Sequence, residues 1–289
     1  MTVRIAVLGV GRIGRMHAQL IARQVPGAAL AMVQDVNADA AAAVGAELQV
    51  PHTTDIADVF ANPHVDAVAI CSSTDTHVPL LIAAAQAGKA IFCEKPVSLD
   101  LAKVDEALAV VKASGVPIQI GFNRRFDPAH KSVRDAVASG AVGDLHVLRI
   151  TSRDPAPPPI AYVKVSGGLF LDMMIHDFDM ARFFVPNIVQ VSAMGANSFS
   201  KEIKAENDYD SVMVTLRGAN NELVNIVNSR HSSFGYDQRL EAFGSCVPKE
   251  EGRLAKDAPS AGPRVGVEML LPQAGHGVIG RRGVECDGA

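Results

Sequence analysis

A glycine-rich segment near the N-terminus constrains the fold more than any other feature of this 289-residue chain. Gly9-Val10-Gly11-Arg12-Ile13-Gly14 follows the apolar run 4–8 and opens a helical pattern over 13–23. Glycines at this spacing allow a tight turn, close approach of a pyrophosphate and close packing of helix on strand. Asp35 ends the next apolar run, where a carboxylate can accept a hydrogen bond from a ribose 2′-hydroxyl. We predict a dinucleotide site, and the charge of Asp35 favours NAD over NADP; the alternative is a glycine turn that binds nothing.

Short apolar runs alternate with helical patterns as far as residue 121, as in the βα units of a parallel sheet. Ser98 is a candidate N-cap of the third helix, and Gly88 and Gly115 are expected to end two of the helices. The right-handed crossover rule places a ligand crevice at the carboxyl ends of the strands. We predict strands at 4–8, 30–34, 67–71, 90–93 and 118–121, and helices at 13–23, 78–87 and 101–113.

The pattern changes after residue 121. A helix at 127–139, a strand at 145–152 and a helix at 168–184 precede three segments that alternate as antiparallel strands do, 189–196, 211–217 and 222–229. The predicted fold class is therefore α/β, in two parts. A Rossmann doubly wound parallel sheet spans residues 1–121, and an α+β domain with an open, mostly antiparallel sheet spans 122–245.

Three residues are candidates for catalysis. Lys95, in Glu94-Lys95-Pro96 directly after a strand, can donate a hydrogen bond to a reacting oxygen, although a solvated lysine is the alternative. Asp172 and His176 are spaced i,i+4 on the predicted helix 168–184, so they are expected to share one face. His176 suits the role of general base, because imidazole titrates near neutrality. The alternative is a structural histidine, and Asp177 and Asp179 could equally be its partners.

Further candidates surround these motifs. Arg124 and Arg125 lie where the first predicted domain meets the second, where a guanidinium could hold substrate hydroxyls or simply pair with acids. Tyr236 could donate a hydrogen bond to a polyol or could only pack. In addition to the glycines and Asp35, the predicted cofactor contacts are Arg12, Ile13, Ser72, Thr74, His77, Glu94 and Lys95.

Composition excludes several classes of function. A net charge of −4 argues against a nucleic-acid partner, which would require clustered cations. No apolar run reaches the roughly 20 residues needed to span a membrane, and no signal sequence is evident, so we expect a soluble cytoplasmic protein. The four cysteines form no CxxC pair and no catalytic zinc ligands cluster, so we predict reduced thiols and no metal.

Several of these motifs together resemble the Gfo/Idh/MocA oxidoreductase family, and most closely its inositol 2-dehydrogenases. The similarity is carried by the glycine-rich turn, Glu94-Lys95-Pro96, Gly167-Gly168 with Asp172 and His176, and the segments 121–128, 151–155, 176–182 and 236–239. It extends to about Ser245. The resemblance implies the catalytic set Lys95, Asp172 and His176, with Asp35 on the adenosine ribose and Arg124, Asp154 and Tyr236 near the substrate.

The resemblance also implies a reaction and an assembly. The expected substrate is a small-molecule cyclic polyol, myo-inositol first, oxidised to 2-keto-myo-inositol with formation of NADH. The open alternatives are another sugar or inositol isomer, and an NAD-binding relic without catalysis. The resemblance further implies a dimer or tetramer formed through the open sheet, and a Lys95-Pro96 peptide bond in the cis form.

The family-like pattern stops after Ser245. Residues 246–289 contain no aromatic side chain, and glycines and prolines interrupt any strand or helix period. We expect a poorly ordered tail, and we hypothesise that a frameshift or early stop has replaced the original C-terminal segment. Translation of the coding DNA in the other two frames tests this hypothesis, which fails if neither frame restores a family-like continuation.

Overall fold

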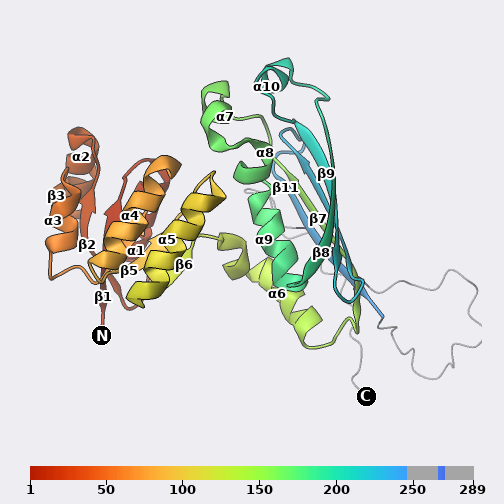
Figure 1. Cartoon of the computed structure of the whole chain (residues 1–289), viewed down its shortest axis with the longest axis horizontal. Coiled ribbons are helices and arrows are strands. Elements are labelled where there is room, and N and C mark those ends of the chain that lie inside the picture. Colours follow the sequence, from red (N-terminus) through yellow and green to blue (C-terminus); the bar gives the residue numbers. More distant parts are fainter. Residues whose placement is uncertain (246–265, 271–289) are drawn as a thin grey trace, which may run out of the picture. The chain divides into compact units, whose positions relative to one another are not determined.

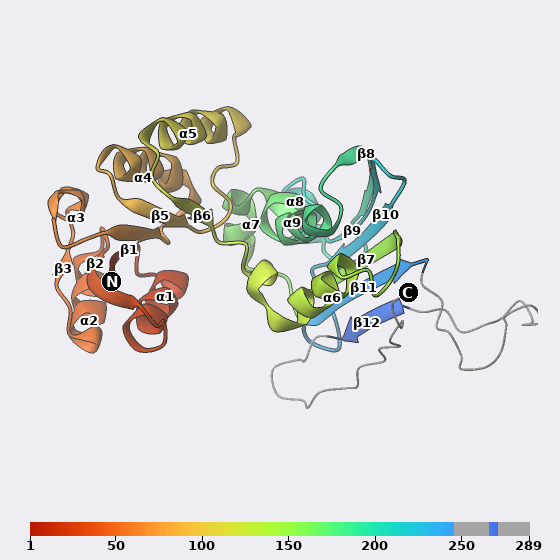
Figure 2. The same ribbon diagram turned by 90° about the horizontal axis from the view of Figure 1, so that it is seen from below.

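In the computed structural model, residues 1–245 and 266–270 are described, and the chain forms two compact units, Met1–Phe122 and Asn123–Ala289 (Figure 1). The first unit contains one sheet with strand order β3-β2-β1-β4-β5-β6, and all its described pairings are parallel. Helices α1 and α2 lie on one side of this sheet and α4 and α5 on the other (Figure 2). Its elements are β1 (Val3–Leu8), α1 (Arg12–Arg23), β2 (Ala28–Gln34), α2 (Ala38–Leu48), β3 (His52–Thr53), α3 (Ile56–Ala61), β4 (Ala67–Ile70), α4 (Thr74–Gln86), β5 (Ala90–Cys93), α5 (Leu101–Ser114) and β6 (Ile118–Ile120).

The apolar runs of the sequence form the central strands because both faces of the sheet are covered. Ala6 and Leu8 pack in one buried cluster, whereas Val7 between them packs in the other. A strand that is buried on both faces has no polar side, so it appears in the sequence as an unbroken apolar run. The predicted doubly wound sheet is confirmed.

Two details of the first unit concern helix ends. Gly115 ends α5 with φ +72° and Gly88 follows the last residues of α4 with φ +69°, as predicted. The prediction of Ser98 as N-cap is wrong. Asp100 caps α5, since its side chain accepts a hydrogen bond from Ala102 N at 2.9 Å. Ser98 Oγ instead accepts from the backbone N–H of Asp100 at 3.1 Å.

The second unit is built on a mixed sheet of order β12-β11-β7-β10-β9-β8, in which β7 and β10 are parallel and the other described pairs antiparallel. Helices α6, α8 and α9 lie on one side of it (Figure 1) and contribute to one buried cluster with the strands. The mostly antiparallel sheet is confirmed. Its elements are η1 (Asn123–Phe126), α6 (Pro128–Ala138), β7 (Leu145–Arg153), α7 (Ile160–Ser166), α8 (Gly168–Asp172), α9 (Ile175–Phe184), β8 (Ile188–Ala196), α10 (Lys201–Ala205), β9 (Ser211–Gly218), β10 (Leu223–Ser229), β11 (Asp237–Gly244) and β12 (Gly266–Leu270).

The predicted single helix over 168–184 is wrong. The structure has two helices, α8 and α9, separated at Met173 and Met174. Both methionines are buried, at 7% and 0% exposure. The break therefore separates Asp172, at the end of α8, from His176, in the first turn of α9.

One strand lies in the segment for which the sequence predicted no regular structure. Residues 266–270 form β12, which pairs antiparallel with β11, Arg239 opposite Leu270 and Phe243 opposite Gly266. The expectation of an irregular tail is wrong for these five residues. Residues 246–265 and 271–289, on which the frameshift hypothesis also rests, lie outside the described part of the chain.

Candidate active site

The three glycines of the β1–α1 turn meet different structural demands. Gly9 has φ +83°, and a Cβ there would lie 2.6 Å from Ser72 Cα. A Cβ on Gly14 would lie 1.8 Å from the Gly9 carbonyl oxygen, so this glycine allows α1 to pack on the turn. A Cβ on Gly11 would meet no atom within 4 Å. Packing within the described chain thus explains the first and third glycines, and the space beside Gly11 fits the approach of a ligand.

The N-terminus of α1 adds to this fit. No side chain caps the helix, so the N–H groups of its first turn are not satisfied by a capping residue. Such groups, together with the positive end of the helix dipole, bind phosphate. The turn of this chain therefore suits the pyrophosphate of NAD.

Asp35 lies beside the same turn. Its Oδ2 accepts a hydrogen bond from Val10 N at 2.7 Å, and its Oδ1 accepts one from Asn37 N at 2.9 Å. These two contacts hold the carboxylate at the carboxyl ends of the neighbouring strands β1 and β2. Each carboxylate oxygen has a further acceptor position, and the negative charge disfavours a 2′-phosphate. The residues present fit the adenosine ribose of NAD.

The other predicted cofactor contacts follow β4 and β5, which continue the same sheet edge. Ser72 Oγ lies 2.6 Å from Thr76 Oγ1, and Thr74 begins α4. Glu94 Oε1 lies 2.7 Å from His17 Nε2, and its Oε2 accepts from Lys95 N at 3.3 Å. The Lys95-Pro96 peptide bond is cis, as the resemblance implied.

His77 differs from the role that the sequence suggested. It is 1% exposed, and its Nδ1 and Nε2 face the carbonyl oxygens of Pro96 and Ser72 at 2.8 and 3.1 Å. Both ring nitrogens thus contact backbone groups of the protein. This arrangement contrasts with the direct cofactor contact predicted from the sequence.

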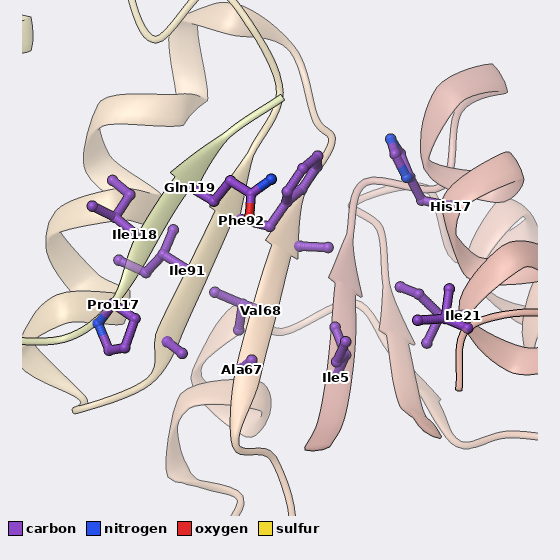
Figure 3. A pocket seen from close by; sticks show the side chains of 13 residues that line it. Ile5, His17, Ile21, Ala67, Val68, Ile91, Phe92, Pro117, Ile118 and Gln119 are labelled. Carbon is purple, nitrogen blue, oxygen red and sulfur yellow. The ribbon is translucent and has the colours of Figure 1, made fainter. Parts of the chain in front are cut away.

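A separate cavity of about 490 Å³ lies on a face of the first sheet. Figure 3 shows its walls, with Ile5, Val68 and Ile91 on the strands and His17 and Ile21 on α1. The lining is mostly apolar, and it contains none of the predicted cofactor contacts. Doubly wound sheets bind their ligands at the carboxyl ends of the strands. We therefore place the candidate site at that edge and not in this cavity.

In the second unit, Asp172 is held through both carboxylate oxygens. Tyr162 donates its hydroxyl to Oδ1 at 2.7 Å, and Arg230 NH1 lies 3.4 Å from Oδ2. Arg230 is 0% exposed and also pairs with Asp208 Oδ2 at 3.2 Å. Asp208 in turn accepts a hydrogen bond from Leu169 N at 2.9 Å, in the first turn of α8. A buried cation thus connects both ends of the short helix that carries Asp172.

Sequence patterns did not single out Arg230, Asp208 or Tyr162 as site residues. A signal was present for Arg230, because it continues the alternation that places Val224 and Ile226 on the buried face of the strand, where a charge is unusual. Nothing comparable marks Tyr162 or Asp208, which are polar residues outside the predicted strands and helices.

Asp177 and Asp179, the alternative partners of His176, both accept hydrogen bonds from arginines. Asp177 is 0% exposed and accepts hydrogen bonds from Arg124, Ser152 and Asn228. Asp179 receives the guanidinium of Arg125 at 2.7 Å. The two aspartates fix and neutralise the two arginines at the start of the second unit.

The remaining predicted substrate contacts gather at one edge of the second sheet. Asp154 follows β7 and donates its N–H to Ser229 O, at the end of the parallel strand β10, at 3.0 Å. Tyr236, 60% exposed, precedes β11, whose first residue, Asp237, pairs with Arg153. Arg230 follows β10, so the structure brings it to the same edge as Asp154 and Tyr236.

Asp154 has a perturbed ionisation. Burial raises the pKa of its carboxyl group above the ordinary value, and the nearby carboxylates Asp172 and Asp177 raise it further. Arg230 and Arg124 oppose this shift. A folded-state pKa above the unfolded one means that Asp154 favours folding at low pH, and that this contribution is lost as the pH rises through the folded-state pKa.

We expect the Asp154→Asn variant to be more stable than the parent chain at neutral pH, because the amide avoids a buried charge. The thermal midpoint of the second unit should rise by roughly 1–3 °C. The difference should vanish below about pH 3.9, the ordinary aspartate value, where the carboxyl group is protonated in both states. Thermal unfolding of both proteins at the two pH values measures this, and a lower midpoint for the variant at neutral pH would contradict it.

The described residues contain no group of three or more His, Cys, Asp or Glu placed to hold a metal ion. Among the same residues, no helix is long and apolar enough to cross a bilayer. Cys71 and Cys93 are free thiols, and burial raises the pKa of Cys93 to about 12. A thiol of that pKa is protonated at neutral pH, so Cys93 is not a nucleophile. Cys246 and Cys286 lie outside the described part of the chain.

Two family models match the chain. The oxidoreductase family with an NAD-binding Rossmann fold matches residues 3–122, and the GFO/IDH/MocA C-terminal domain matches residues 130–246. The chain is 46% identical over 256 residues to myo-inositol 2-dehydrogenase of Thermotoga maritima, covering 88% of this chain and 75% of that protein. It is also 46% identical over 246 residues to inositol 2-dehydrogenase of Rhizobium meliloti, covering 85% and 74%.

A solved structure with bound ligands is also similar. It is scyllo-inositol dehydrogenase from Lactobacillus casei with bound NAD(H) and scyllo-inositol, at a TM-score of 0.78 and 30% sequence identity. The match covers 85% of this chain and 74% of that chain.

Proposed function

Because this chain belongs to the Gfo/Idh/MocA family of NAD-binding oxidoreductases, we propose that it oxidises a secondary alcohol of a cyclic polyol, myo-inositol first, to the ketone. The observation that carries the proposal is the 46% identity, over 75% of its length, to an enzyme named for this substrate. The product from myo-inositol is 2-keto-myo-inositol. The reaction removes a hydride, which is two electrons and a proton, from the alcohol carbon and a second proton from its hydroxyl group. The ketone and NADH are the products.

In the proposed mechanism, His176 accepts the hydroxyl proton as general base. Lys95 donates a hydrogen bond to the reacting oxygen and stabilises the negative charge that develops there. Asp172, fixed by Tyr162 and Arg230, orients the groups around that oxygen. When bound, NAD supplies the hydride acceptor. Arg124, Asp154 and Tyr236 are proposed to bind the other hydroxyl groups of the ring.

The contacts proposed for the cofactor divide by type. The glycine turn, with Arg12 and Ile13, is proposed to hold the pyrophosphate, and Asp35 the adenosine ribose. The nicotinamide half is proposed to lie against the residues that follow β4 and β5, which are Ser72, Thr74, Glu94 and Lys95. The fit of Gly11 and Asp35 to a dinucleotide supports this assignment.

A specific observation favours a second substrate. A similar solved structure holds scyllo-inositol, which differs from myo-inositol in the configuration at one carbon, with NAD(H). We therefore include scyllo-inositol as the alternative substrate of the same site. Hydroxyl stereochemistry is read by hydrogen bonds, and a site built to bond a hydroxyl can reject the wrong isomer strongly.

The test is NADH formation by the purified full chain with NAD and a panel of polyols. We expect turnover with myo-inositol, weaker turnover with scyllo-inositol and none with the acyclic polyol sorbitol. NADH binding, followed by the fluorescence of the dinucleotide, is measured in parallel. A folded protein that binds NADH but oxidises no polyol would show that the chain is a cofactor-binding relic.

A cytoplasmic location and a dimer or tetramer formed through the open sheet stay predictions. Exposed apolar side chains on the second sheet, including Met194 and Met213, which pair across β8 and β9, are compatible with a partner on that sheet. Light scattering of the purified chain measures the assembly.

A further inference from the structure

His77 is a buried side chain for which the proposed reaction gives no role. It lies in the second turn of α4, and each of its two ring nitrogens faces a backbone carbonyl oxygen of a different loop. One is the carbonyl of Ser72, after β4, and the other is the carbonyl of Pro96, after β5. The ring therefore connects the two strand-end loops that carry predicted cofactor and catalytic residues.

Each loop leads directly to a functional element. Ser72 is the residue against which the glycine turn packs, since a Cβ on Gly9 would lie 2.6 Å from its Cα. Pro96 shares a peptide bond with Lys95. A displacement of the Ser72 carbonyl would thus move the residue on which the glycine turn packs, whereas a displacement of the Pro96 carbonyl would move Lys95.

We propose that His77 is a positioning residue with two separable functions. The assignment requires the ring to donate from both nitrogens, as an imidazolium does. Nε2 donates to the Ser72 carbonyl oxygen and sets the glycine turn for cofactor binding, and Nδ1 donates to the Pro96 carbonyl oxygen and sets Lys95 for catalysis. His77 touches neither substrate nor cofactor in this assignment. The catalytic half of the proposal rests on the proposed function of Lys95, whereas the cofactor half rests only on the Rossmann turn.

Two amide side chains separate the contacts. The Nδ2 of asparagine occupies the place of the histidine Nδ1, so His77→Asn can keep the Pro96 contact and loses the one to Ser72. The Nε2 of glutamine occupies the place of the histidine Nε2, so His77→Gln can keep the Ser72 contact and loses the one to Pro96. Each variant thus removes one contact and retains the other.

The expected results are opposite for the two variants. His77→Asn should weaken NAD binding roughly fivefold, as for one lost hydrogen bond, and keep kcat within about threefold. His77→Gln should keep NAD binding within about twofold and lower kcat roughly 10- to 100-fold, because small misplacements of a catalytic group are costly. The exposed His64, which contacts Arg4 near the amino ends of the strands, supplies the control His64→Asn, for which neither quantity should change.

A readout without turnover distinguishes failure of this proposal from failure of the proposed function. Hydrogen exchange of the peptide spanning residues 91–99, read by mass spectrometry, should be faster in His77→Gln than in His77→Asn. Exchange of residues 70–78 should show the reverse order. If the parent chain oxidises no polyol, the proposed function fails, but these exchange rates and the NADH affinities still test the positioning by His77.

Three outcomes would overturn the proposal. Equal losses of kcat and cofactor affinity in both variants would show that His77 only stabilises the fold. Parent-like behaviour of both variants would show that neither contact positions a functional group. Loss of folding in both, measured by circular dichroism, would show that the two contacts are not separable.

Discussion

Replacing Lys95 with Met or His176 with Asn should each lower kcat about 100- to 1000-fold while NAD binding stays close to that of the parent chain. A positioned general base contributes roughly 10²–10⁴ in rate, and a group that stabilises a developing oxyanion contributes about 10²–10³. Stopped-flow or steady-state NADH formation with myo-inositol gives kcat, and fluorescence titration with NADH gives the affinity. Lys103→Met and His231→Asn, at exposed positions of α5 and the loop after β10, are the matched controls.

The double variant of Lys95 and His176 tests whether the two residues act on the same hydroxyl group. Groups that work as a unit are strongly non-additive, so the double variant should be little slower than the slower single variant. If the two rate losses multiply instead, the residues act independently, and the proposed shared site is contradicted.

Replacing Arg230 with Met should destabilise the second unit by about 3–5 kcal/mol, because it leaves the carboxylates Asp172 and Asp208 without their buried counterion. Arg230→Lys should be intermediate, since an ammonium group is a point charge and cannot reproduce the fork that reaches both acids. Urea unfolding followed by circular dichroism measures the change. Under conditions in which Arg230→Met is folded, this variant should also oxidise myo-inositol more slowly than the parent chain, because Asp172 loses the group that holds its Oδ2.

An exposed ion pair of the same unit provides the control. Arg149 pairs with Glu241 at 3.3 Å and is 65% exposed, so Arg149→Met should change the free energy of unfolding by less than about 1 kcal/mol. Adding Asp208→Asn to Arg230→Met should recover part of the lost stability, since it removes the charge of one of the two carboxylates that Arg230 contacts. Equal effects of Arg230→Met and Arg149→Met would show that burial of the arginine contributes nothing.

Local sequence patterns predicted the parts of the candidate site that depend on neighbours in the chain. The glycine turn lies where the motif placed it, and Asp35 lies beside it, because a strand, a tight turn and a helix are specified within a few residues. Lys95 follows β5 at the carboxyl edge because parallel strands all end at that edge. Its cis peptide bond with Pro96 came from family resemblance and not from any local pattern.

Patterns failed where a side chain's role depends on a distant part of the chain. The i,i+4 spacing of Asp172 and His176 predicted one helix face, but the helix is interrupted at Met173 and Met174, between these two residues. Asp177 and Asp179 were candidate partners of His176 by proximity in sequence. They pair with arginines 53 and 54 positions away, which the sequence alone could not reveal.

By itself, the sequence determined the doubly wound sheet, the dinucleotide turn and the identity of the residues available for hydride chemistry, because these follow from apolar period, glycine spacing and side-chain type. Only the tertiary structure decided that Arg230 holds Asp172 from 58 positions away and that His77 faces two backbone carbonyls instead of open space. The physical reason is that a buried polar group is hydrogen-bonded in a folded protein, and its partner need not be close to it in the sequence. That partner is chosen by packing between strands and helices that are far apart in the chain.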